Sequence, residues 1–177
     1  MSRLLFISLL FAVCAARAGE FPDSWTWDDP PQAQAPRVHE GKPMPPLNLT
    51  GWLNGKVTPD AMKGKVVMLD FYTTWCPTCI TDIPHNNALY EKYQSKGLVM
   101  IGICTSDEGL ADMPNLVHAK NLKYPTALDL HLACLKAWNV SMFPTYALID
   151  RKGVLRVISL KPEHLEEVIQ KLLAEGM

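Results

Sequence analysis

The chain has 177 residues, 48% of them hydrophobic, which suits one globular domain with additional segments at its ends. Its 17 lysines and arginines nearly balance its 18 acidic residues. This balance gives no indication of nucleic acid or another charged polymer as a partner.

Residues 1–18 have the pattern of a secretory signal peptide. A positive charge at Arg3 precedes an apolar run over residues 4–15, and residues 16–18 (Ala-Arg-Ala) match a small-x-small cleavage site. The run is shorter than the about 20 residues that cross a membrane, so cleavage is favoured over retention as an anchor. We therefore expect an exported protein, periplasmic or secreted, whose cysteines meet an oxidising compartment.

The segment that follows the signal peptide differs in composition from the rest of the chain. Residues 19–46 are rich in proline, contain two tryptophans and show no apolar period. This predicts a linker, or an arm laid over the surface of the domain. The folded domain is expected over residues 47–177, beginning with a short hairpin (residues 47–49 and 56–58) around Asn54-Gly55.

The first half of this domain is predicted to alternate between strand and helix. Residues 66–72 are rich in strand-forming residues, and residues 98–104 are a continuous apolar run, typical of a strand buried on both faces. A helix over residues 77–95 separates them, with a kink expected at Pro84.

The second half completes an α/β pattern. Helical segments are predicted at 112–121 and 130–138, followed by a hairpin of strands at 145–149 and 154–159. An amphipathic helix opens at Pro162. The order β-α-β-α-(α)-β-β-α predicts a three-layer α/β fold, with a central mixed sheet flanked by helices.

Cys76 and Cys79 form a C-x-x-C pair between the first buried strand and the helix after it. A helix N-terminus favours negative charge, so we expect Cys76 to ionise more readily than an ordinary thiol. A structural zinc site would need further Cys or His ligands at regular spacing, and none follows. The pattern therefore favours thiol–disulfide exchange, without a metal or another cofactor.

Two motifs around this pair occur in a specific order. The first runs from Gly64 to Cys79 and ends in Trp-Cys-Pro-Thr-Cys, and the second runs from Ala137 to Thr145 and ends in Phe-Pro-Thr. Together they resemble the thioredoxin superfamily, and more closely the exported TlpA/ResA-type thiol–disulfide oxidoreductases. The likeness covers roughly residues 40–175 and implies a thioredoxin-like fold.

The resemblance implies that Cys76 is the nucleophile and Cys79 the resolving thiol. Chemistry supports the same order, because thiolate attack gives a mixed disulfide that the second thiol then breaks. We expect Cys76 to be exposed at the helix start and Cys79, one turn further along, to be more buried.

Four further residues are expected to bind the substrate, and one of them, Trp75, to shield the cysteine pair. They are Trp75, Pro77, Phe143 and Pro144. The resemblance implies that Pro144 follows a cis peptide bond and packs against the disulfide, whereas an ordinary trans proline is the alternative. For Trp75 the alternative is a plain core residue.

Two acidic residues lie close to the cysteines in the sequence and are candidates for a role at the thiols. Asp70 lies six residues before Cys76 inside a buried strand, where a charge is costly unless it is used or paired. The resemblance to thioredoxins implies that it takes the proton of Cys79; a carboxylate facing solvent at the strand end is the alternative. Asp82, three residues after Cys79, occupies a place where TlpA/ResA-type proteins often carry a glutamate. It is either a modulator of the thiols or a surface acid.

The remaining cysteines of the domain, Cys104 and Cys134, belong to no redox motif. A structural disulfide between them and a pair of buried thiols are both open.

The leading hypothesis is an exported thiol–disulfide oxidoreductase. It acts as a monomer on disulfide-containing protein substrates, and a membrane electron donor keeps it reduced. The first alternative is a thiol peroxidase, because Thr73 precedes Cys76 by three residues, as in peroxiredoxins. The second is a copper chaperone, which the cysteine spacing disfavours.

Overall fold

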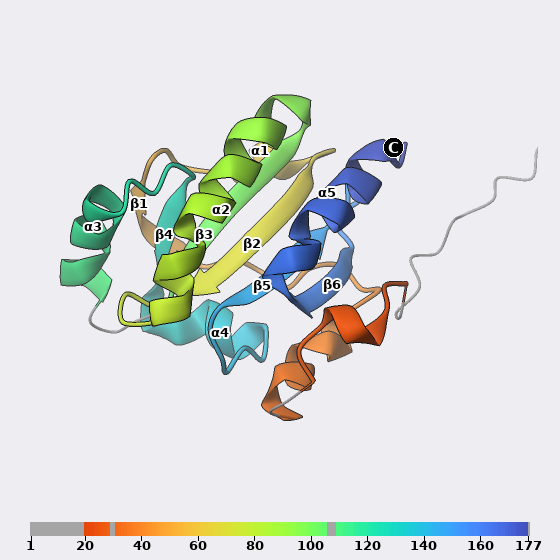
Figure 1. The fold of residues 1–177 in the computed structure, drawn as a ribbon, viewed down its shortest axis with the longest axis horizontal. Coiled ribbons are helices and arrows are strands. Elements are labelled where there is room, and N and C mark those ends of the chain that lie inside the picture. Colours follow the sequence, from red (N-terminus) through yellow and green to blue (C-terminus); the bar gives the residue numbers. More distant parts are fainter. Residues whose placement is uncertain (1–19, 29–30, 106–108, 177) are drawn as a thin grey trace, which may run out of the picture.

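A six-stranded mixed sheet forms the centre of the fold (Figure 1). The computed structural model describes residues 20–28, 31–105 and 109–176, so the expected signal peptide lies outside the described residues. The strands are β1 (Leu49–Leu53), β2 (Val66–Tyr72), β3 (Leu98–Cys104), β4 (Thr126–Asp129), β5 (Thr145–Ile149) and β6 (Leu155–Leu160). Their order across the sheet is β1-β4-β3-β2-β5-β6.

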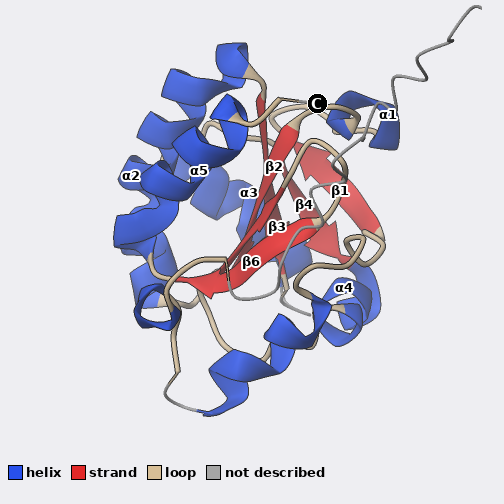
Figure 2. Ribbon diagram, turned by 90° about the vertical axis from the view of Figure 1, so that its right-hand side faces the viewer, coloured by secondary structure: helices blue, strands red, loops and turns tan. Residues whose placement is uncertain are grey.

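Helices cover both faces of this sheet (Figure 2). The α-helices are α1 (Pro59–Met62), α2 (Pro77–Tyr93), α3 (Gly109–Ala119), α4 (Ala133–Ala137) and α5 (Leu165–Ala174). Apolar side chains of α2 and α5 pack with Met68 and Met100 on one face. On the other face, Cys134 and Trp138, in α4 and just after it, pack with Phe71. The predicted three-layer α/β fold with a central mixed sheet is confirmed.

Strand β2 is the centre of the sheet and leads into the cysteine pair. All seven of its residues are buried. It pairs in parallel with β3 and antiparallel with β5, which places Asp70 opposite Gly102 on one side and Tyr146 on the other. The two cysteines follow at the carboxyl end of this strand, where α2 begins.

The predicted hairpin at the start of the domain is wrong. Strand β1 pairs antiparallel with β4, far along the chain, and residues 56–58 form no strand. The Asn54 side chain donates hydrogen bonds to the carbonyl oxygens of Leu122 and Tyr124, so this turn is bound to the segment before β4. After it the chain enters α1, whose first turn is capped by Thr58.

The proline-rich segment is an arm and not a detached linker. Two short 3-10 helices, Asp23–Trp25 and Pro31–His39, place it beside β6. The backbone N–H of Trp27 donates to the carbonyl of Ser159 at 2.9 Å, and that of Gly41 donates to Leu155 at 2.8 Å. The arm thereby covers an edge strand that would otherwise expose unpaired backbone groups.

A buried arginine in β6 forms ion pairs with residues near both ends of the described chain. Arg156 forms ion pairs with Glu20 of the arm, with Asp150 and with Glu175 after α5. Burial opposes the charge of this guanidinium, but the carboxylates outweigh it and raise the pKa of Arg156. The boundary of the domain at residue 47 stays a prediction.

Gly102 in β3 makes room for the side chains around Asp70. A Cβ at this position would lie 2.6 Å from Thr126 Oγ1 and 3.1 Å from the Tyr124 ring. Gly102→Ala is therefore expected to destabilise the protein by about 1–3 kcal/mol, as overpacking of a core does. Urea unfolding measures the change, with Gly176→Ala as the control because a Cβ there meets nothing within 4 Å. Equal stability of the two variants would contradict this account of the packing.

Candidate active site

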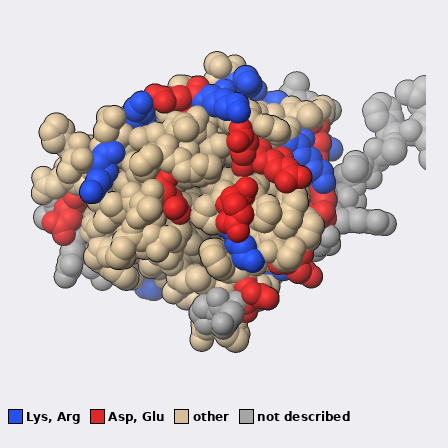
Figure 3. Space-filling model, viewed as in Figure 1, with Lys and Arg blue, Asp and Glu red and all other residues tan. Residues whose placement is uncertain are grey.

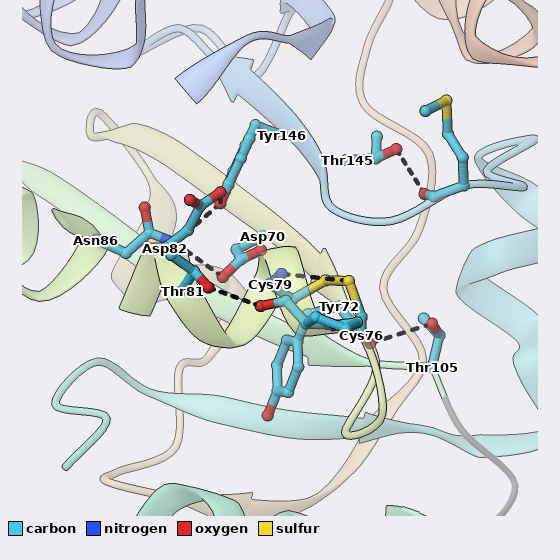
Figure 4. The surroundings of a disulfide bond; sticks show 12 residues. Asp70, Tyr72, Cys76, Cys79, Thr81, Asp82, Asn86, Thr105, Thr145 and Tyr146 are labelled. Carbon is cyan, nitrogen blue, oxygen red and sulfur yellow. Dashed lines mark hydrogen bonds between the residues drawn. A yellow bond between two sulfur atoms is a disulfide. The ribbon is translucent and has the colours of Figure 1, made fainter. Parts of the chain in front are cut away.

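The cysteine pair is a disulfide at the first turn of α2 (Figure 4). The Cα atoms of Cys76 and Cys79 are 5.3 Å apart. Cys76 is the N-cap of the helix, and Pro77 occupies the first helical position, where its missing N–H costs no hydrogen bond. The backbone N–H of Cys79 points at the Cys76 sulfur, at 3.2 Å. The same N–H and the helix N-terminus would stabilise a Cys76 thiolate once the disulfide opens.

The expected difference in exposure between the two cysteines is wrong for the disulfide form. Cys76 is 6% exposed and Cys79 is 5% exposed. The bond brings both sulfurs into one apolar site, so their burial is shared. Position on the helix still separates them, because Cys76 precedes the first turn whereas Cys79 lies within it.

An exposed apolar surface borders the disulfide. Trp75 is 66% exposed, which excludes the plain core residue, and its ring meets the edge of Phe143 with centroids 6.4 Å apart. The Phe143–Pro144 peptide bond is cis, which confirms the expected geometry. Pro77 is exposed on the same helix start. Their part in binding substrate stays a prediction.

A cavity of about 310 Å³ opens beside Trp75. It lies between the loop before α2 and α3. Its lining residues are Thr74, Trp75, Asp112, Asn115, Leu116 and Ala119. Asp112 is the charged residue of this lining.

Asp70 is buried in the middle of the sheet, at 3% exposure, so the alternative of a solvent-facing carboxylate is wrong. Its Oδ2 accepts hydrogen bonds from the Tyr124 hydroxyl at 2.8 Å and from the Asn86 amide at 3.2 Å. Its Oδ1 has no hydrogen-bond partner among the described residues.

The surroundings of Asp70 raise its pKa. Burial raises the pKa of Asp70 to about 7, and the negative charge of Asp82 adds to this, whereas the hydrogen bonds from Tyr124 and Asn86 oppose it. A carboxyl with this pKa exchanges its proton readily near neutral pH. Asp70 lies among the residues around the disulfide (Figure 4), and its part in proton transfer stays a prediction.

Asp82 is linked to strand β5 by a hydrogen bond. It is half-buried on α2, and its carboxylate accepts a hydrogen bond from the Tyr146 hydroxyl at 3.0 Å. Asn86, one turn further along α2, donates to the same hydroxyl at 3.1 Å. Its role as a modulator of the thiols stays a prediction.

Sequence reasoning missed Asn86 and Tyr146. Asn86 is four residues after Asp82, which places both on one face of the helix. Tyr146 is two residues after Pro144 and pairs with Asp70 in the sheet. The helical spacing was visible in the sequence, but the strand register was not.

Cys104 and Cys134 carry thiols and form no disulfide with each other. Cys104 ends β3 and lies in an apolar cluster with Cys76 and Cys79, on the α2 side of the sheet. Cys134 lies in the cluster of the opposite face, where its sulfur accepts the N–H of Asn48 at 3.2 Å. The sheet separates the two sulfurs, and burial raises the pKa of Cys134 to about 12. The alternative of two buried thiols is the correct one.

Neither a metal centre nor a membrane helix occurs in the described part of the chain. Across residues 20–28, 31–105 and 109–176, no group of three or more His, Cys, Asp or Glu residues could hold a metal ion. Within the same ranges, no helix has the length and apolar character to cross a membrane.

Comparison with known proteins agrees with this geometry. The family model described as Redoxin matches residues 39–173. The thiol-disulfide oxidoreductase ResA of Bacillus cereus is 34% identical over 143 residues, which cover 79% of this chain and 82% of that protein. ResA of Bacillus subtilis is 28% identical over 123 residues, covering 69% and 68%.

A solved structure shows the same fold. The structure of a thioredoxin-like protein in its oxidised form superposes with a TM-score of 0.67 at 26% identity, covering 76% of this chain and 97% of that one. The matched region contains the disulfide, Asp70 and the cis peptide bond before Pro144. The chain therefore belongs to the redoxin family and is a thiol–disulfide oxidoreductase with the thioredoxin fold.

Proposed function

We propose that this oxidoreductase reduces disulfide bonds of protein substrates after export from the cytoplasm. The observation that carries the proposal is a C-x-x-C disulfide at a helix N-terminus, with a buried carboxyl near it and exposed Trp75 beside it. Exposed Trp75 and Pro77 and half-buried Phe143 offer an apolar surface to a polypeptide next to the reactive sulfurs, whereas Pro144 is buried.

The reaction proceeds by two thiol–disulfide exchanges. The Cys76 thiolate attacks one sulfur of the substrate disulfide, and the other substrate sulfur leaves as a thiolate. Asp70 then takes the proton of Cys79, and the Cys79 thiolate attacks the Cys76 sulfur of the mixed disulfide. The second substrate sulfur leaves, so the substrate has gained two electrons and the protein carries the disulfide seen in the structure.

The residues around the pair favour the role of a reductant. Pro77 and Thr78, between the cysteines, carry no charge that would stabilise a thiolate strongly and make the disulfide a strong oxidant. Asp70 assists the half of the cycle that reduces the substrate. An exported reductant must be reduced again, so a membrane electron donor is the implied partner.

Location and assembly complete the proposal. Residues 1–18 direct export to the periplasm or the outside, with cleavage favoured over a retained anchor. Charged side chains of both signs occur together on the face shown in Figure 3, and the net charge is −1, which supports a protein partner over nucleic acid. The protein acts as a monomer.

The reduction potential of the Cys76–Cys79 pair tests the direction of electron flow. We expect a value nearer to about −270 mV, as in thioredoxin, than to about −120 mV, as in a strong oxidant. Equilibration of the mature domain with glutathione or dithiothreitol buffers measures it. A potential above about −150 mV would make the protein an oxidase that installs disulfides.

Insulin reduction in the presence of dithiothreitol tests the activity itself. Accelerated precipitation of insulin is the expected result. Peroxide consumption that outpaces insulin reduction would favour a thiol peroxidase, and tight copper binding without insulin reduction would favour a copper chaperone.

A further inference from the structure

A continuous chain of hydrogen bonds joins the buried Asp70 to the half-buried Asp82 (Figure 4). Asn86 donates to Asp70 at 3.2 Å and to the Tyr146 hydroxyl at 3.1 Å. Tyr146 in turn donates to Asp82 at 3.0 Å. The described mechanism uses one of these four side chains, Asp70, and leaves the others without a function.

The direction of each bond in this chain follows from donor chemistry. A tyrosine hydroxyl has one hydrogen, which Tyr146 donates to Asp82, so its oxygen accepts the hydrogen bond from Asn86. The Asn86 amide nitrogen has two hydrogens and can supply both of its bonds. Hydrogen bonds in such a chain polarise one another, so the negative charge of Asp82 affects the hydrogen bonds that reach Asp70.

Tyr146 is the rigid member of this chain next to Asp82. Its side chain is fully buried, and β5 places it directly opposite Asp70 in the sheet. Asp82 is half-buried and near the protein surface, where a short carboxylate can turn toward water. The bond from Tyr146 is therefore what fixes the direction in which the Asp82 charge points.

We propose that Tyr146 is a positioning residue that holds the Asp82 carboxylate toward Asp70, so that the negative charge of Asp82 acts on Asp70. The inference rests on the proposed function in one respect, namely the use of Asp70 as the proton acceptor of Cys79.

The groups around Asp70 explain why Asp82 matters. Three tyrosines lie around Asp70, namely Tyr72 from β2, Tyr124 from the segment before β4 and Tyr146 from β5. All three are neutral at pH 7, because burial raises their pKa values above the ordinary value for tyrosine. Asp82 on α2 is the charged group that acts on it, and its negative charge raises the pKa of Asp70. The negative charge of Asp82 therefore makes Asp70 a stronger base toward the Cys79 thiol.

A carboxyl-carbon NMR titration of Asp70 in the oxidised protein tests the coupling without any substrate. Asp82→Asn is expected to lower the pKa of Asp70. The same substitution in a Tyr146→Phe background is expected to lower it much less, because the carboxylate is then no longer held toward Asp70. The four proteins form a double-mutant cycle whose coupling term is the quantity of interest.

Tyr93 provides a matched control on the same helix. It is also buried, and its hydroxyl donates to the carboxylate of Glu166 at 2.7 Å. Tyr93→Phe and Glu166→Gln remove an equivalent bond and are expected to leave the pKa of Asp70 unchanged. Thermal unfolding and the intact disulfide verify that each variant is folded.

Two results would overturn the proposal. An equal shift from Asp82→Asn in both backgrounds would show that Tyr146 does not position the charge. An unchanged pKa of Asp70 in Asp82→Asn alone would show that the acids are not coupled, and this variant leaves the buried Tyr146 in place even if Tyr146→Phe fails to fold.

The kinetics separate this inference from the proposed function. If the titration shows the coupling while Asp70→Asn leaves the second exchange step at its normal rate, the coupling stands and the proton-acceptor role of Asp70 fails. If Asp70→Asn slows that step while the titration shows no coupling, the proposed function stands and the role of Tyr146 fails.

Discussion

Cys76→Ser is expected to abolish disulfide reduction, whereas Cys79→Ser is expected to attack substrate normally and then stop as a mixed disulfide. The reason is the position of the two sulfurs on α2. The Cys76 sulfur is the N-cap group that receives a backbone N–H, so its thiolate is stabilised for attack. Insulin reduction measures the loss in Cys76→Ser, and gel electrophoresis without reductant detects the trapped complex of Cys79→Ser.

A matched control separates these effects from the general loss of a thiol. Cys134→Ala removes a buried thiol on the opposite face of the sheet and is expected to keep its reductase activity. Normal turnover of Cys79→Ser would contradict the assigned roles. So would alkylation of Cys79 before Cys76 in the reduced protein.

The elements next to the cysteines could be predicted because their sequence patterns are strong. Residues of β3 form a long apolar run, those of β2 are strand-forming and apolar except for Asp70, and the C-x-x-C pair indicates where α2 begins. Strand β4 was missed because it has four residues, too few for a periodic pattern. Strand β1 was assigned to a hairpin because Asn54-Gly55 favours one, whereas its actual partner is distant in sequence and invisible to local reasoning.

The reactive residues of the site could be predicted, but the contacts between them could not. Resemblance to known motifs identified Asp70 and the cis peptide bond at Pro144. The path from Asp70 to Asp82 depends on the register between β2 and β5, which places Tyr146 opposite Asp70. Register is set by side-chain burial across the whole sheet, so no single segment encodes it.

Asp70→Asn is expected to stabilise the protein at neutral and alkaline pH. The pKa of Asp70 is raised from 3.8 to about 7, so between these values the folded state binds a proton that the unfolded state has lost. The stability of the unmodified protein therefore falls as the pH rises through this window, and Asp70→Asn removes that loss. A difference of one unit in pKa corresponds to about 1.36 kcal/mol. The free energy of unfolding of the variant is therefore expected to exceed that of the unmodified protein by at most about 4 kcal/mol at pH 8. Below about pH 4 both proteins carry a neutral side chain and their stabilities should be similar.

The same substitution is expected to slow the second exchange step, by an amount of order 10²-fold. The deficit should be largest near pH 7, where Asp70 is partly ionised and the Cys79 thiol is not. It should shrink toward pH 9, because a cysteine with a pKa of about 8.5 then ionises without help. Rapid-quench measurement on a preformed mixed disulfide gives this rate directly. A variant that unfolds less readily yet resolves the mixed disulfide more slowly would identify Asp70 as an acid retained for catalysis at a cost in stability. Equal rates of the second exchange step in both proteins from pH 6 to pH 9 would show that Asp70 has no part in proton transfer.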